Sequence, residues 1–129
     1  MSVKSSLLIP LCVCFVFVEG CTKPQQKWVE PIVAHEISPQ PPRVGPVTLT
    51  LKLTDFSGAA ITGVQLAVEG NMSHAGMVPV FAEAKEIEPG RYRSVMELSM
   101  AGDWTVTVHM TRSRNRKMDY TFEINGVEP

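Results

Sequence analysis

The chain has 129 residues, with 12 Lys and Arg against 13 Asp and Glu and a formal net charge of −1 at pH 7. A chain of this length holds one small domain, and a balanced charge provides no basic field for nucleic acid. We therefore expect a single domain that does not bind a polynucleotide.

The first 21 residues have the pattern of an export signal. Lys4 supplies a basic start, and Leu7 to Val18 is an apolar stretch that is too short to span a bilayer comfortably. The sequence Val18-Glu19-Gly20-Cys21 resembles the lipobox of a bacterial lipoprotein, in which cleavage precedes a lipid-modified cysteine. We expect a signal peptide over 1–20, lipidation of Cys21 and an exported protein anchored to an envelope membrane. An ordinary signal peptide or a short membrane anchor is the alternative.

The position of cleavage decides which metal ligands the mature domain retains. Cleavage before Cys21 removes Cys12 and Cys14, and the remaining cysteine is committed to lipid. A metal site would then use His, Met or carboxylate ligands. Residues 21–43 contain "KPQQKWVEP" and most of "SPQPPRVGP", which ends at Pro46. This proline-rich segment is expected to form a tether that runs into an edge strand.

The rest of the chain, residues 44–129, alternates apolar and polar residues in the manner of β-strands. "VTLTLKLTD", for example, alternates Val47, Leu49, Leu51 and Leu53 against threonines and a lysine. Together with the edge strand expected at Ile32 to Ile37, about seven short strands are predicted, and such strands must cover one another in two sheets. We therefore expect an all-β, immunoglobulin-like antiparallel β-sandwich. The other predicted features are strands at 64–68, 80–87, 91–100, 103–110 and 117–124, with turns at 89–90 and 101–102.

Three motifs give this region a family resemblance. They are "NMSHAGMVPV", Gly90-Arg91-Tyr92 and the run from Met100 to Trp104. In this order they resemble the YtkA-like domain family, which is related to FixH, over roughly Val44 to Ile124. The resemblance implies an exported immunoglobulin-like domain of a kind sometimes found in copper handling or cytochrome oxidase assembly.

The first motif concentrates soft ligands in a loop. Met72, His74 and Met77 offer two thioethers and an imidazole, a set that suits Cu(I) and does not suit Mg, Ca or Mn. Immunoglobulin strand order places the turn at 101–103 at the same end of the sandwich, which brings Met100 towards them as a fourth candidate. The alternatives are that Met72 packs in the core and that Met100 is a hydrophobic plug.

Other histidines and methionines are predicted to lie outside this site. His109, Met110 and Met118 fall at the far end of the sandwich, and His109 has the parity of the outward-facing residues. Met96 is expected in the core, and His35 could face either way. The basic turn at 112–117 also falls at the far end and is expected to be solvated, with contact to anionic lipid as a further possibility.

Three classes of function follow from these features. The first is a lipid-anchored protein that binds copper, taken as Cu(I), and exchanges it with a donor or acceptor protein of the envelope. The second is a metal-free protein-interaction module in which the Met-rich loop is an apolar contact. We expect no enzyme, because the sequence places no Ser/His/Asp or Cys/His set and no paired carboxylates at one end of the sandwich.

Overall fold

The computed structural model describes residues 20, 29–74 and 76–129. Within these residues the chain forms seven β-strands. Residues 1–19 of the expected signal peptide and residues 21–28, which include Cys21 and the start of the expected tether, lie outside these residues. Nothing helical occurs among the described residues, so none of them forms a helix able to cross a membrane. The strands are β1 (Ile32–Ser38), β2 (Gly45–Thr54), β3 (Gln65–Asn71), β4 (Val80–Glu88), β5 (Arg91–Leu98), β6 (Gly102–Ser113) and β7 (Arg116–Val127).

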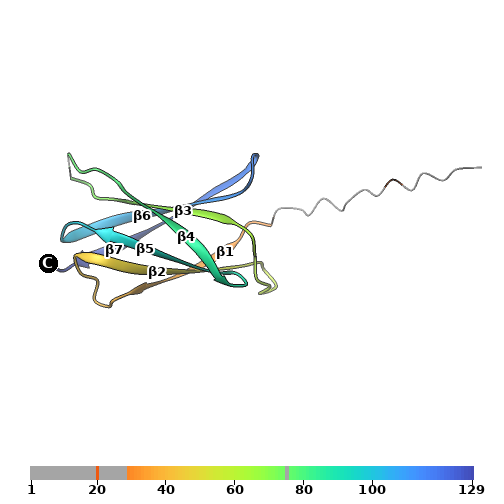
Figure 1. Cartoon of the computed structure of the whole chain (residues 1–129), viewed down its shortest axis with the longest axis horizontal. Coiled ribbons are helices and arrows are strands. Elements are labelled where there is room, and N and C mark those ends of the chain that lie inside the picture. The colour runs from red at the N-terminus through yellow and green to blue at the C-terminus, as the bar shows by residue number, and fades with distance from the viewer. Residues whose placement is uncertain (1–19, 21–28, 75) are drawn as a thin grey trace, which may run out of the picture.

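The strands form two facing layers that β4 joins. The order is β1-β2-β5-β4-β3-β6-β7, and every neighbouring pair is antiparallel. The first part of β4 pairs with β3 and its last part with β5, so β4 crosses from one layer to the other (Figure 1). This arrangement confirms the prediction of an all-β antiparallel sandwich with seven strands.

Alternation of apolar residues along the strands produces the core. On β2, Val47, Leu49, Leu51 and Leu53 are all buried, whereas the residues between them are partly or fully exposed. The same period of two buries one face of β3, β5 and β6. Because both layers turn their apolar faces inward, neither strand set has to be stable alone.

The Gly90-Arg91-Tyr92 motif packs against the connection between β2 and β3 at one end of the sandwich. Gly90 has a φ of +76°, and a Cβ there would lie 2.8 Å from the Cβ of Ala60, so this turn requires glycine. The hydroxyl of Tyr92 donates to the carbonyl of Ile61 at 3.0 Å and accepts from the amide of Val64 at 3.2 Å. Burial raises the pKa of this hydroxyl to about 12, so it remains protonated and can donate.

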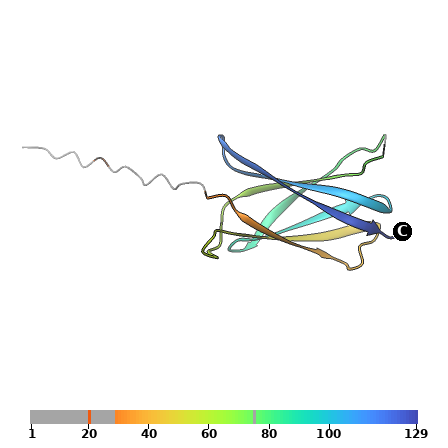
Figure 2. The same cartoon turned by 180° about the vertical axis from the view of Figure 1, so that it is seen from behind.

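The two ends of the sandwich collect different segments (Figures 1 and 2). The paired residues divide the domain into two halves that we name after these ends. The entry half, where the described chain enters β1, consists of residues 29–36, 50–66, 84–93 and 110–118. The loop half consists of residues 37–49, 67–74, 76–83, 94–109 and 119–129.

Candidate functional site

The Met and His loop lies beside the turn that carries Met100. β3 ends at Asn71, which is paired with Thr105, and β6 starts three residues before Thr105 at Gly102. A Cβ placed on Gly102 would lie 3.0 Å from the Cε of Met72. The predicted proximity of the loop to this turn is therefore confirmed, and Met72 is the side chain that touches it.

His74 and Met77 follow Met72 in a tight local bend. The amide of Met77 donates to the carbonyl of His74 at 3.4 Å, and Gly76 has a φ of +85°, which a residue with a Cβ resists. The His74 side chain is exposed, whereas Met77 is partly buried against the core. An imidazole open to solvent and a half-covered thioether thus sit three residues apart.

Met72 and Met100 differ sharply in their exposure. Met72 is 8% exposed and belongs to the core, so the packing alternative for this residue is observed. Met100 is 46% exposed, so it does not plug the end of the hairpin. Its carbonyl accepts a hydrogen bond from the Nε1–H of Trp104 at 2.9 Å, which fixes the turn to the core.

Three residues, Gly70, Met96 and Trp104, pack together on the inner side of the end of β3. Met96 and Trp104 are each 1% exposed, as expected for Met96. A Cβ on Gly70 would lie 2.9 Å from the Sδ of Met96 and 3.4 Å from the Cε3 of Trp104. Glycine at position 70 therefore lets these two large side chains pack directly under the last residues of β3.

The structure also tests the residues predicted to lie outside the site. Met110 is buried in the core of the entry half, and Met118 is partly buried on β7. The ring of His35 stacks on Phe122 with centroids 3.9 Å apart, and its Nδ1 lies 2.9 Å from the Tyr120 hydroxyl. Burial lowers the pKa of His35. These partners hold His35 against β7, and neither of them belongs to the Met and His loop.

Sequence reasoning did not anticipate the surroundings of His109. It faces outward as expected, but its Nε2 lies 2.8 Å from Glu69 and its Nδ1 lies 2.7 Å from Asp119. Both nitrogens can donate only in the imidazolium form. The two carboxylates, Glu69 first, accordingly raise the pKa of His109, and His109 in turn lowers the pKa of Glu69.

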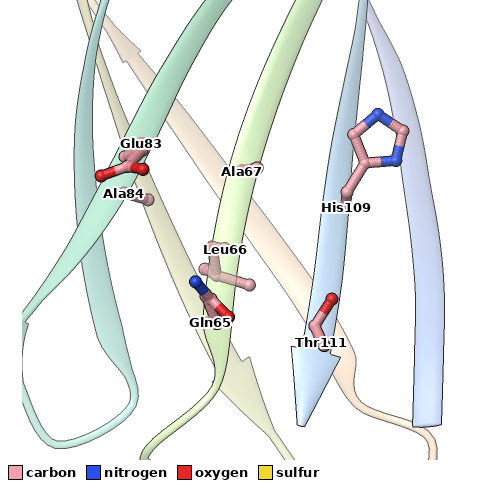
Figure 3. Close-up of a pocket in the computed structure, with 7 residues that line it drawn as sticks. All are labelled: Gln65, Leu66, Ala67, Glu83, Ala84, His109 and Thr111. Carbon is pink, nitrogen blue, oxygen red and sulfur yellow. The ribbon is translucent and has the colours of Figure 1, made fainter. Parts of the chain in front are cut away.

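A shallow hollow of about 280 Å³ lies beside this histidine on the outer face of β4, β3 and β6. Figure 3 shows the short Ala67 side chain between Glu83 and His109, and this small residue creates the hollow. Within the described ranges, no three His, Cys, Asp or Glu side chains are grouped in a way that could hold a metal ion.

The contacts of His109 with Glu69 and Asp119 should make the unfolding free energy of the domain depend on pH. Because folding raises the pKa of His109, its contribution is complete below the unfolded value of about 6.5 and is lost as the pH rises through the folded value. We expect His109→Gln to lose more unfolding free energy at about pH 5.5 than at about pH 9, as measured by urea denaturation. These two pH values lie on either side of the range in which an imidazole titrates.

The matched control for this experiment is His35→Gln. Burial lowers the pKa of His35, so its contribution is present above about 6.5 and is lost as the pH falls. The two variants should therefore show opposite trends with pH. A loss in His109→Gln that is independent of pH would show that the imidazolium does not stabilise these strands.

The chain matches a known protein family. The model of the YtkA-like family matches residues 27–109, which is more than half of the chain. The matched region includes β1 and runs to His109 on β6, so it contains the Met and His loop, the Gly90-Arg91-Tyr92 turn and Trp104. Among curated proteins there is no match.

Proposed function

Because the chain belongs to the YtkA-like family, we propose that it is a lipid-anchored envelope protein that binds Cu(I) and passes it to a partner protein. The proposed ligands are Met72, His74, Met77 and Met100. The observation that carries this proposal is the meeting of the loop with the β5–β6 turn, where the methyl group of Met72 lies against Gly102. Soft donors from two separate segments thereby reach one end of the sandwich.

The chemistry of these donors selects the ion. Thioethers are soft and uncharged, and imidazole is a borderline ligand, which together favour Cu(I) over the hard cations that prefer oxygen. The loop half also carries one basic residue, Arg43, against seven Asp and Glu. An acidic surface of this kind raises the local concentration of cations and speeds their approach.

The uneven exposure of the donors suits transfer as well as binding. Met72 is packed and Met77 half-packed, so they can hold the ion from the protein side, while His74 and Met100 remain open to solvent. A partner could therefore replace the exposed ligands first. In this proposal copper is cargo, and no reaction is catalysed.

Anaerobic titration with Cu(I) against a competing chelator tests the proposal on the chain from Cys21 onward, which lacks the thiols of Cys12 and Cys14 and carries Cys21 in its lipid-modified form. We expect roughly one Cu(I) per chain, as the single donor set implies. In the variant Met72→Leu/His74→Ala/Met77→Leu, the affinity should fall by more than the roughly 10–100-fold that loss of a supporting outer group causes.

The control variant Met110→Leu/Met118→Leu/His35→Gln removes the same number of thioethers and imidazoles elsewhere in the fold. Its affinity for Cu(I) should stay at the level of the unaltered chain. If the loop variant keeps its fold, as judged by urea denaturation, and still binds Cu(I) as tightly as the control, the proposed site is wrong.

A metal-free interaction module is the second candidate, and one observation favours it. Val78 and Phe81, next to the loop, are 78% and 69% exposed, and exposed apolar groups of this size are typical of contact surfaces. This candidate expects that Cu(I) leaves the midpoint of thermal unfolding unchanged and that a partner is recovered equally well in the presence of a copper chelator.

A further inference from the structure

Charge is divided unevenly between the two halves of the domain. The entry half contains eight Lys and Arg against five Asp and Glu, whereas the loop half contains one against seven. The whole described domain is acidic, yet its entry half has a net positive charge. The domain therefore has a charge dipole directed along the axis that joins its two ends.

The β6–β7 hairpin provides the most concentrated positive charge. Arg112, Arg114, Arg116 and Lys117 occupy four of six successive positions, and residues 110–118 contain no Asp or Glu. Arg112, Arg114 and Lys117 are exposed. The tip of this hairpin projects from the entry end in both views of the molecule (Figures 1 and 2).

Three of the acidic groups of the entry half are engaged within the fold. Glu86 accepts a hydrogen bond from the amide of Gly63 at 3.1 Å, and Glu88 pairs with Arg91 at 3.2 Å. Asp55 accepts bonds from the amides of Ser57 and Ala59 in its own turn. Arg91 is itself paired in the contact with Glu88, and the hairpin, with four basic residues and no acidic one, carries the largest share of the net positive charge of this end.

The position of the expected lipid anchor indicates that the surface facing this end is a membrane. β1 begins at Ile32, at the same end as the hairpin, and Cys21 lies 11 residues before it. A chain extends by at most about 3.6 Å per residue, so the tether permits a separation of no more than about 40 Å. A lipid anchor at Cys21 would hold the basic end permanently near the bilayer, at a high effective concentration.

We propose that the entry half docks on an anionic lipid surface through the β6–β7 hairpin. Basic clusters next to a membrane anchor bind anionic headgroups, and the acidic loop half is repelled by the same surface. The two effects orient the domain upright, with the Met and His loop directed away from the bilayer. This inference rests on the tether in the proposed function and does not depend on copper.

Hydrogen exchange of the full chain in lipid vesicles tests the orientation. One set of vesicles contains phosphatidylcholine alone, and the other contains phosphatidylcholine with anionic phosphatidylglycerol. We expect the amides of residues 111–117 to exchange more slowly on the anionic vesicles only, and the loop at 72–79 to exchange equally on both. High salt should remove the protection because it screens exposed charges.

Two variants separate charge from structure. Arg112→Gln/Arg114→Gln/Lys117→Gln should lose the protection, and Arg112→Lys/Arg114→Lys, which keeps the charge, should retain it. Equal protection on both kinds of vesicle, slower exchange at 72–79 on the anionic ones, or protection that appears only on addition of an acidic protein would each overturn the inference.

The same vesicles distinguish this inference from the proposed copper function. A chain that docks but fails to bind Cu(I) would contradict the copper proposal and leave the orientation intact. A chain that stays with neither kind of vesicle has no working anchor, and the inference would then be wrong.

Discussion

Replacing Trp104 with alanine is expected to cost about 3–5 kcal/mol of unfolding free energy, the range for a large aromatic side chain deleted from a core. Trp104 is 1% exposed and packs with Met96 under Gly70. Because both neighbours belong to strands with fixed partners, the cavity cannot collapse easily. For a domain of this size, a loss of that order is a large share of the total stability.

Trp104→Phe separates packing from the hydrogen bond to Met100. Phenylalanine keeps an aromatic ring in the core but removes the Nε1–H that donates to the Met100 carbonyl at 2.9 Å. We expect a smaller loss of stability, with roughly 0.5–1.5 kcal/mol from the bond itself. The β5–β6 turn should also become more mobile, which hydrogen exchange at residues 99–102 would detect.

Urea denaturation measures both Trp104 variants, and Phe56→Ala is the control. Phe56 is 80% exposed, so its removal should change stability by no more than about 0.5 kcal/mol. If Trp104→Ala cost as little as Phe56→Ala, the ring would not be the centre of this core. If Trp104→Phe left exchange at the turn unchanged, the bond to Met100 would not hold the turn in place.

The fold could be predicted from the sequence wherever one rule applied along a whole strand. On β2 the alternation of Val47, Leu49, Leu51 and Leu53 marks both the strand and its buried face, and the structure agrees at each position. β4 gave a weaker signal because it crosses between the layers, and none of its residues is fully buried. A strand that changes partners along its length does not turn the same face to the core throughout, so its apolar residues do not alternate regularly.

The location of the candidate site was also accessible, because antiparallel strand order alone brings the 72–79 loop and the β5–β6 turn to the same end. The burial of each side chain at this site could not be predicted from the sequence. Met72 continues the inward series of β3 beyond the end of the strand, and its low exposure and its contact with Gly102 show that it remains packed. The clamp of His109 between Glu69 and Asp119 depends on the register of three strands, which periodicity does not determine.

Met72→Leu is expected to separate the two roles of Met72. Leucine is similar in volume and apolar, so the free energy of unfolding should fall by less than about 1.5 kcal/mol. The thioether is lost, however, so the affinity for Cu(I) should fall clearly. Met72→Ala loses the thioether and most of the packing as well, and should cost about 2–5 kcal/mol of stability.

Met96→Leu is the matched control for Met72→Leu. It also removes one buried thioether from the same end of the core, but Met96 is 1% exposed, packs against Gly70 and is not one of the proposed ligands. Its affinity for Cu(I), measured by chelator competition, should be unchanged. Equal affinities in Met72→Leu, Met96→Leu and the unaltered chain would show that Met72 serves the core alone.

The packing of Met72 bears on how tightly such a site could bind. A ligand that the core already holds in one conformation loses little conformational entropy when it binds an ion, whereas exposed His74 and Met100 must be ordered at a cost. Loss of Met72 should therefore weaken binding more than loss of Met100. Met100→Leu, compared with Met72→Leu in the same titration, measures this difference, and a larger effect at Met100 would contradict the argument from packing.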